Sequence, residues 1–307
     1  MGRVGVDLYP TPDQVRRPLS RIDRYDRFVG GFAGNVATGL ARLGIRTAIA
    51  SRVGDDGHGR FVHDFLVAEG VGVQWLVVDT ELRTALAFCE VWPPDRFPIT
   101  FYRTPTCPDW RLSRTDLDLE AMAQVPLLYV TGTGLARSPS RETTIEAMTK
   151  HTGRTIFDLD HRGVLWEHAE NYRLYAMLAC RYADVVVGNS EEVMVATGVT
   201  DERAAATAIL SLGPSIVFAK RGQDGCAVHE AAGTTEVRGF PVQVSNGLGA
   251  GDAFAAALGY GLLLQLPLER TVALANAAGA MVATKIPCSA AMPSLSELEA
   301  FLEERRG

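Results

Sequence analysis

The sequence predicts an α/β fold, with a mostly parallel central sheet in three α/β/α layers and a small β-strand lid. Short apolar runs rich in β-branched residues alternate with segments of helical periodicity, as in parallel sheets that helices cover on both faces. The 307 residues are 47 % apolar, enough for a sizeable core. No repeat or low-complexity linker interrupts this pattern. We therefore expect one domain over residues 1–307.

The first third of the chain predicts strands and helices of mixed lengths. We expect strands at 3–7, 47–53 and 73–78, and helices at 34–43 and 56–69. The stretch 84–104 contains two strand-like runs around Pro93-Pro94, which is typical of a hairpin. Since this hairpin does not fit a parallel sheet, we expect 73–78 and 84–104 to form the lid.

The remainder alternates more strictly between strand and helix. Buried parallel strands are expected at 127–131, 155–158, 185–189 and 216–220, and a short hairpin at 226–229 and 234–238. Helices are expected at 141–151, 169–182, 203–211, 250–264, 268–284 and 295–304.

Composition excludes several classes of protein. The net charge is −6 without a basic patch, which argues against nucleic-acid binding. Five scattered cysteines without a CxxC pair favour neither zinc nor disulfides, and indicate a reducing cytoplasm. The start of the chain is polar and unlike a signal peptide. The most apolar stretch, 253–264, is too short to span a membrane. We expect a cytoplasmic protein.

A glycine-rich segment, Asn246-Gly247-Leu248-Gly249-Ala250-Gly251-Asp252, opens a helix of small residues. Its small residues let the backbone approach a ligand, and the amides of a helix N-terminus favour an anion. A carboxylate there suits a base that takes a proton from a hydroxyl attacking a phosphoryl group. Alternatively, this is a glycine-rich turn in which Asp252 interacts only with the helix dipole.

A second glycine run, Gly30-Gly31-Phe32-Ala33-Gly34-Asn35-Val36-Ala37, also opens a helix. Asn35 in the first turn can reach substrate hydroxyls, or it can be an ordinary polar residue of a loop. Neither run is a Walker P-loop, because no G-x-x-x-x-G-K-[ST] occurs in the chain.

The two motifs together, in this order and separation, resemble the ribokinase-type (PfkB) carbohydrate kinases over essentially the whole chain. The resemblance implies a ribokinase-like fold, and ATP and Mg²⁺ as cofactors. It implies that Asp252 is the catalytic base and that the amides of Gly249, Ala250 and Gly251 form an anion hole for the γ-phosphoryl group. It also implies sugar contacts from Asp7, Gly31 and Asn35.

The resemblance extends to the nucleotide site. Asn189-Ser190-Glu191-Glu192 resembles the element that holds magnesium and phosphates, with Glu192 acting through water. The segment Lys220–Gly225 resembles a loop beside the nucleotide, and Asn276 a residue that lines the adenine pocket. Plainer alternatives stay open: solvated acids in a first helical turn, surface charges, and a buried polar group. The nucleotide-binding candidates are Asn189, Lys220, Gly222, Gly225 and Asn276.

The acceptor is expected to be a sugar acid. Arg103 and Arg162 lie outside the glycine-rich motifs, and arginine binds carboxylates in a bidentate manner. Either can instead pair with a neighbouring acid. Phe88 and Tyr102 complete the candidate acceptor site. The aromatic-then-arginine element at Arg103 and the Arg-x-x-Leu-Trp element at Arg162 resemble the branch that acts on 2-keto-3-deoxygluconate. A closer resemblance, carried by residues 2–10, 83–90 and 246–248, is to the branch that phosphorylates the C6 hydroxyl of 5-dehydro-2-deoxygluconate in inositol catabolism.

Three alternatives stay open: a 2-keto-3-deoxygluconate kinase, another PfkB sugar kinase, and a non-catalytic sugar- or nucleotide-binding protein. Asn246-Gly247 replaces the family's Asp-Thr, which puts activation by K⁺ in doubt. An exposed lid edge predicts a homodimer through the lid. We expect no nucleic-acid or membrane partner.

Overall fold

The computed structural model describes residues 1–286 and 288–305. The chain divides into two compact units, which we describe one at a time. The first unit consists of Met1–Arg3 and Asp109–Gly239, and the second of Val4–Pro108 and Phe240–Gly307. The single domain expected over 1–307 stays a prediction.

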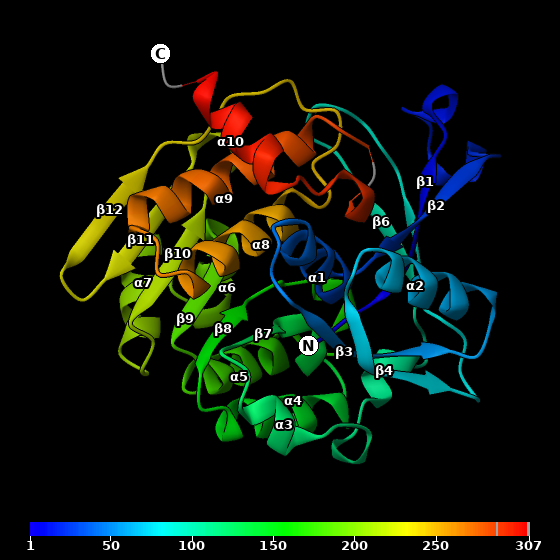
Figure 1. The fold of residues 1–307 in the computed structure, drawn as a ribbon, viewed down its shortest axis with the longest axis horizontal. Coiled ribbons are helices and arrows are strands. Elements are labelled where there is room, and N and C mark those ends of the chain that lie inside the picture. Colours follow the sequence, from blue (N-terminus) through cyan, green and yellow to red (C-terminus); the bar gives the residue numbers. More distant parts are fainter. Residues whose placement is uncertain (287, 306–307) are drawn as a thin grey trace. The chain divides into compact units, whose positions relative to one another are not determined.

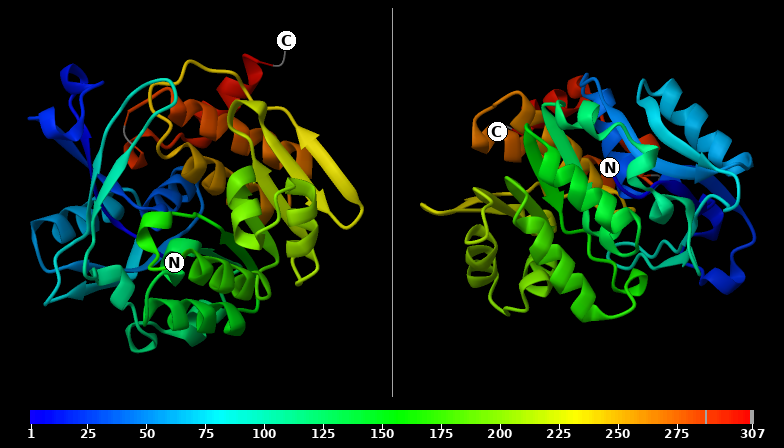
Figure 2. Two further views of the ribbon diagram at one scale, coloured as in Figure 1. Left: turned by 180° about the vertical axis from the view of Figure 1, so that it is seen from behind. Right: turned by 90° about the horizontal axis from the view of Figure 1, so that it is seen from below.

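A six-stranded sheet in the order β12-β11-β10-β9-β8-β7 forms the centre of the first unit (Figure 1). Its four parallel strands follow the prediction closely, and their apolar residues are almost fully buried. The hairpin of β11 and β12 forms one edge, drawn in yellow-green and yellow (Figure 2). The strands are β7 (Leu127–Thr131), β8 (Arg154–Asp158), β9 (Val185–Asn189), β10 (Ile216–Lys220), β11 (Cys226–Glu230) and β12 (Gly233–Val237).

Helices connect the parallel strands of this unit, as the alternating pattern predicts. The expected helices are confirmed with ends that differ by one or two residues. The short helix α3 was not foreseen, and α6 was anticipated only by the alternative that placed two acids in a first helical turn. The helices are α3 (Leu119–Ala123), α4 (Ser140–Lys150), α5 (Ala169–Cys180), α6 (Ser190–Thr197) and α7 (Glu202–Leu210).

The second unit contains a four-stranded sheet and a separate pair of strands. The sheet runs β2-β1-β5-β6, with β5 and β6 antiparallel as expected for the hairpin. Segment 73–78, expected beside that hairpin, instead lies within β4 and pairs in parallel with β3. The lid role of 73–78 and 84–104 stays a prediction. The strands are β1 (Gly5–Pro10), β2 (Tyr25–Gly30), β3 (Ala48–Gly54), β4 (Gly72–Asp79), β5 (Leu86–Cys89) and β6 (Ile99–Tyr102).

Five α-helices of the second unit agree with the predicted positions. The Asp56 carboxylate accepts hydrogen bonds from two amides at the start of α2 and so caps it. A capping box at Ser294 starts α10 in the same way. The helices are α1 (Phe32–Arg42), α2 (Gly57–Ala68), α8 (Ala250–Leu263), α9 (Leu268–Ala283) and α10 (Leu295–Glu303).

Helices α1 and α8 pack closely against each other. A Cβ built on Gly39 of α1 would lie 2.6 Å from the Cβ of Ala256 on α8, below any normal carbon–carbon contact. The glycine therefore sets the spacing of the two helices.

The described part of the chain has no helix long and apolar enough to cross a bilayer. All five cysteines are buried: Cys89, Cys107, Cys180, Cys226 and Cys288.

Candidate active site

The glycine-rich turn before α8 has the backbone form of an anion site. Gly249 is the N-cap residue, with φ of 83°, in the left-handed region that glycine adopts at low cost. A Cβ there would also lie 2.9 Å from the Cβ of Cys288, so a side chain does not fit. Ala250 and Gly251 occupy the first two helical positions, where backbone N–H groups lack partners within the helix.

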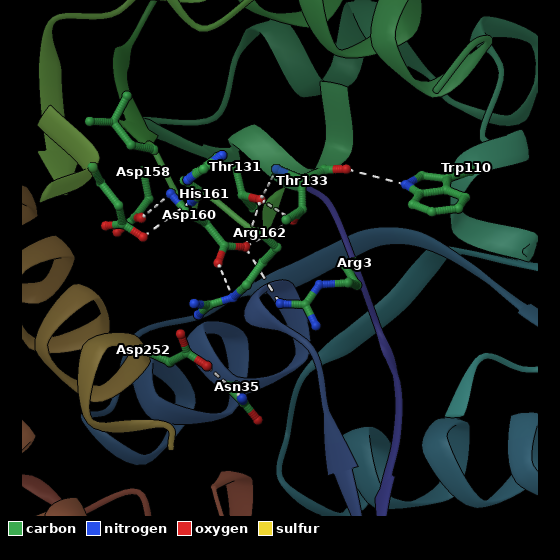
Figure 3. Close-up of polar contacts among 12 residues, drawn as sticks. Arg3, Asn35, Trp110, Thr131, Thr133, Asp158, Asp160, His161, Arg162 and Asp252 are labelled. Carbon is green, nitrogen blue, oxygen red and sulfur yellow. Dashed lines mark hydrogen bonds and ion pairs between the residues drawn. The ribbon is translucent and has the colours of Figure 1, made fainter. Parts of the chain in front are cut away.

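Asp252 sits in the first turn of α8 and contacts Asn35 of α1 (Figure 3). The Asn35 Nδ2 atom donates to Asp252 Oδ2 at 2.6 Å. Since an ionised carboxylate can only accept, the nitrogen side of the amide must face it. The amide oxygen of Asn35 consequently points elsewhere, and it is buried without a hydrogen-bond partner. Such an orphan acceptor costs about 1–3 kcal/mol, unless a ligand supplies the missing donor.

Asp7 and Gly31 lie near the start of α1. Asp7 is on β1, and its carboxyl group occupies the space that a side chain at Gly30 would need. Gly31 has φ of 86° and is the N-cap residue of α1. The two glycines therefore allow the strand β2 to turn into the helix beside a carboxylate.

Three aromatic rings of the four-stranded sheet form one group. The centroid of the Phe88 ring lies 5.3 Å from the Tyr25 ring centroid and 5.1 Å from the Tyr102 ring centroid, and both pairs have edge-on geometry. Tyr102 is 60 % exposed, whereas Arg103, which follows it, is buried. The structure thus brings Phe88 and Tyr102 together.

Two asparagines of the second unit are buried. Asn276 lies in the middle of α9. Asn246, where the family pattern has an acid, donates through Nδ2 to the Ile286 carbonyl and accepts through Oδ1 from the Leu248 amide. Its side chain therefore braces the segment that leads to Gly249.

In the first unit, polar residues collect at the carboxyl ends of neighbouring strands. Lys220, at the end of β10, pairs with Asp158, at the end of β8, with Nζ 3.2 Å from Oδ2. Burial is the main cause that raises the pKa of Asp158 to about 7, partly opposed by Lys220. Lys220 is therefore not the ordinary surface charge left open as an alternative.

Asn189 and Glu192 form a capping box at the start of α6. Asn189 Oδ1 accepts from the Glu192 amide, and the Glu192 carboxylate accepts from the amides of Asn189, at 2.7 Å, and His161, at 3.1 Å. Glu192 is buried rather than solvated. Each of its carboxylate oxygens retains lone-pair capacity, since each accepts one hydrogen bond from these amides.

A role for Glu192 at magnesium through water fits this arrangement. Magnesium usually binds one or two carboxylates together with phosphates and waters, rather than a cage of protein ligands. The residues that the structure describes contain no group of three or more His, Cys, Asp or Glu that could hold a metal ion.

Arg162 pairs with a carboxylate of its own unit. Its Nε lies 3.2 Å from Asp160 Oδ1, while Arg3 lies 3.5 Å from Oδ2 and Thr133 donates to Oδ2 at 2.8 Å (Figure 3). Burial alone would raise the pKa of Asp160, but Arg162, Arg3 and Thr133 together lower it to about 2. Arg162 is 41 % exposed at its side chain, so part of it remains open to solvent.

The loop after β10 depends on Gly225. Gly222 and Gly225 both have positive φ, of 59° and 98°, around a single 3-10 turn, Gly222–Asp224. A Cβ on Gly225 would collide with the backbone of Val237, whereas one on Gly222 would meet open space. Arg221, directly before this turn, donates two hydrogen bonds to the Glu202 carboxylate.

Sequence reasoning missed three charged residues of the first unit: Arg3, Asp158 and Asp160. A signal for Asp158 was present, since it ends a predicted parallel strand, as Asn189 and Lys220 do. Side chains at such strand ends commonly serve binding in α/β proteins.

A family model described as pfkB family carbohydrate kinase matches residues 1–295. A 5-dehydro-2-deoxygluconokinase of Clostridium tetani is 32 % identical, covering 100 % of this chain and 92 % of its own. The enzyme of that name from Geobacillus kaustophilus is 33 % identical, with coverage of 100 % and 93 %.

A solved structure is similar over the same length. The fructokinase of Vibrio cholerae O395, with fructose, ADP and calcium ion bound, is 30 % identical with a TM-score of 0.87. The alignment covers 98 % of this chain and 97 % of the fructokinase. This similarity confirms the predicted ribokinase-like α/β fold.

Proposed function

Because the chain belongs to the pfkB family of carbohydrate kinases, we propose that it phosphorylates 5-dehydro-2-deoxy-D-gluconate with ATP, at the C6 hydroxyl. The product is the 6-phosphate, which we propose is an intermediate of inositol catabolism. The full-length relatives named for this reaction support the choice of acceptor.

One observation carries the proposal. A carboxylate, Asp252, stands in the first turn of α8, directly after a glycine turn with the form of an anion site. A pure binding protein gains nothing from a negative charge where an anion is to be held. A kinase gains a base beside the phosphoryl group that its substrate attacks.

In the proposed mechanism, Asp252 accepts the proton of the acceptor hydroxyl as its oxygen attacks the γ-phosphorus of ATP. The bond from that phosphorus to the β–γ bridging oxygen breaks, and ADP leaves. The amides of Gly249, Ala250 and Gly251 donate hydrogen bonds to the oxygens of the transferring group. These donors are fixed by the helix and need no reorganisation during the reaction.

The first unit supplies groups for the nucleotide. Lys220, held by Asp158, gives a positive charge for phosphate. Asn189 and Glu192 would hold magnesium through water, and the ion would supply positive charge to neutralise the phosphates. Gly222 and Gly225 shape the loop beside the nucleotide. Asn276, in α9, is the residue proposed to contact the adenine.

The acceptor is recognised by its hydroxyls and its carboxylate. Asp7, Gly31 and Asn35 bind hydroxyls, Phe88 and Tyr102 cover the sugar, and Arg103 and Arg162 bind the carboxylate. Arg162 supports this role because its side chain is 41 % exposed.

A coupled assay of ADP release tests the function. The purified chain with MgATP is offered 5-dehydro-2-deoxygluconate, 2-keto-3-deoxygluconate, ribose and fructose, with Asp252→Asn as control. We expect turnover chiefly on the first acceptor, and loss of at least about a hundredfold in the variant. Turnover chiefly on 2-keto-3-deoxygluconate would discard the acceptor, and an unchanged Asp252→Asn rate would discard the base.

We also propose a homodimer formed through the lid. The β6 strand, Ile99–Tyr102, lies at an edge of the four-stranded sheet, and an unpaired strand edge favours association. Light scattering at assay concentration should return twice the mass of the 33.1 kDa chain. A single chain mass would refute the dimer.

A further inference from the structure

Asn35 meets the catalytic base directly, and this contact has a consequence for the reaction. We propose that Asn35 is a positioning residue for Asp252, which fixes the rotation of the base as well as binding substrate. The inference rests on the proposed function, since it requires Asp252 to be the base. Its basis is the 2.6 Å hydrogen bond from Nδ2 to Oδ2, made by a side chain that is only 2 % exposed.

The contact is built by a pair of helices in the same unit. Asn35 and Gly39 are four residues apart on α1, and Asp252 and Ala256 are four residues apart on α8. Residues at this spacing lie on one face of a helix, so the Gly39–Ala256 contact lies one turn from the Asn35–Asp252 contact. The close approach at Gly39 brings the two helices near enough for the short asparagine side chain to reach the carboxylate.

Holding the carboxylate matters because a base must present a lone pair to one hydroxyl proton. An aspartate without partners rotates about its terminal torsion, which has broad minima. A hydrogen bond to Oδ2 restricts this rotation, and a charge-assisted bond of this kind is among the stronger ones in proteins. Asn35 thereby holds the base in the orientation that the reaction uses.

The amide links the base to recognition of the acceptor. The buried Oδ1 of Asn35 has no partner in the described structure, so it accepts from an acceptor hydroxyl when substrate binds. The same amide then contacts both the base and the sugar. Binding of a sugar with a hydroxyl at the matching position therefore also secures the orientation of Asp252.

A double-mutant cycle tests the coupling. The chain, Asn35→Ala, Asp252→Asn and the double variant are assayed with MgATP and 5-dehydro-2-deoxygluconate in single turnover, with radiolabelled γ-phosphate to detect slow rates. We expect Asn35→Ala to lower the rate constant about 10- to 100-fold, the range of a lost charge-assisted hydrogen bond, with the KM for MgATP changed less than about twofold. In the Asp252→Asn background the same change should cost less than about threefold.

Control variants separate loss of this hydrogen bond from altered packing of α1 and from loss of folding. Thr38→Ser alters a buried residue of the same helix but keeps the hydrogen bond from the hydroxyl to the Gly34 carbonyl, so its rate should stay within about twofold of the parent. Thermal unfolding followed by circular dichroism checks each chain. Asn35→Ser replaces Asn35→Ala if the latter does not fold, because its shorter side chain also removes the hydrogen bond from Nδ2 to Asp252 Oδ2.

The outcomes separate the two claims. If Asn35→Ala costs as much without the Asp252 carboxylate as with it, Asn35 acts on the substrate alone and the positioning role is overturned. If Asp252→Asn itself retains the parental rate, the base assignment of the proposed function fails and the inference fails with it. A small cost in the Asp252→Asn background, together with a large one in the parent, supports both.

Discussion

Replacing Gly39 by alanine perturbs the proposed active site without touching a residue that contacts substrate. The new Cβ would lie 2.6 Å from the Ala256 Cβ, whereas carbon atoms prefer about 3.5–4.0 Å. The helices α1 and α8 must therefore separate by about 1 Å. The Asn35–Asp252 hydrogen bond, 2.6 Å in the structure, then opens to about 3.6 Å, beyond useful hydrogen-bond length.

The effect on stability is smaller than the effect on catalysis. Overpacking of a tight contact costs about 1–3 kcal/mol, and the higher helix propensity of alanine returns about 1 kcal/mol. We expect a net loss of about 0–2 kcal/mol in the free energy of unfolding. The rate constant should fall about 10- to 100-fold, as for Asn35→Ala, because the same hydrogen bond is lost.

Two companion variants make the assay decisive. Ala256→Gly added to Gly39→Ala removes the opposing methyl group and should restore most of the rate. Gly57→Ala in α2, where a Cβ meets nothing within 4 Å, should leave the rate unchanged and the chain as stable as before or slightly more so. Urea unfolding and the ADP-release assay measure both quantities. A Gly39→Ala chain with the parental rate would refute the reasoning that helix spacing positions the base.

Three further predictions concern charges and ions. Asp160→Asn should lower the free energy of unfolding at pH 7 by about 2 kcal/mol, since the pKa of Asp160 is lowered from 3.8 to about 2. This difference is nearly full above pH 4 and disappears as the pH falls toward 2, so urea titrations at pH 7, 5 and about 2.5 that show a constant difference would contradict it. Lys220→Met should weaken the binding of MgATP, measured by calorimetry, at least tenfold. Adding Asp158→Asn to this variant should restore stability but not affinity, because it removes the buried unpaired acid without replacing the cation. Restored affinity would show that Lys220 does not serve the nucleotide. Exchange of Na⁺ for K⁺ should change kcat/KM less than about twofold, because the Asn246 amide is engaged by Ile286 and Leu248, and a tenfold stimulation would count against this.

The sequence was most informative where local pattern and burial agree. The strands β7, β9 and β10 have the predicted bounds because each is a short apolar run buried on both faces. Strand β2 was missed because Tyr25–Gly30 carries Asp26 and Arg27, which are exposed at a sheet edge. The pairing of β4 with β3 was also missed, since the sequence of one strand does not determine which strand it pairs with.

The candidate site divides in the same way. The glycine turns at Gly31 and Gly249 were predictable because only glycine suits their positive φ. Contacts between distant side chains were not. Asn35 and Asp252 are 217 positions apart, and the preference of Arg162 for Asp160 depends on where strands β7 and β8 end. Such contacts depend on the tertiary structure, whereas a sequence motif identifies only which residues are candidates.

The close packing of α1 on α8 also bears on how such an enzyme can change its acceptor. On the proposed assignment, the base and its partner come from two helices, while Phe88 and Tyr102 come from the β5–β6 hairpin. The hairpin can therefore be exchanged for that of a relative, as one cassette, while the proton-transfer pair stays as it is. Part of the choice of sugar is thus encoded apart from the base, whereas Asn35 serves both, so selection can alter the hairpin while conserving the Asn35–Asp252 pair.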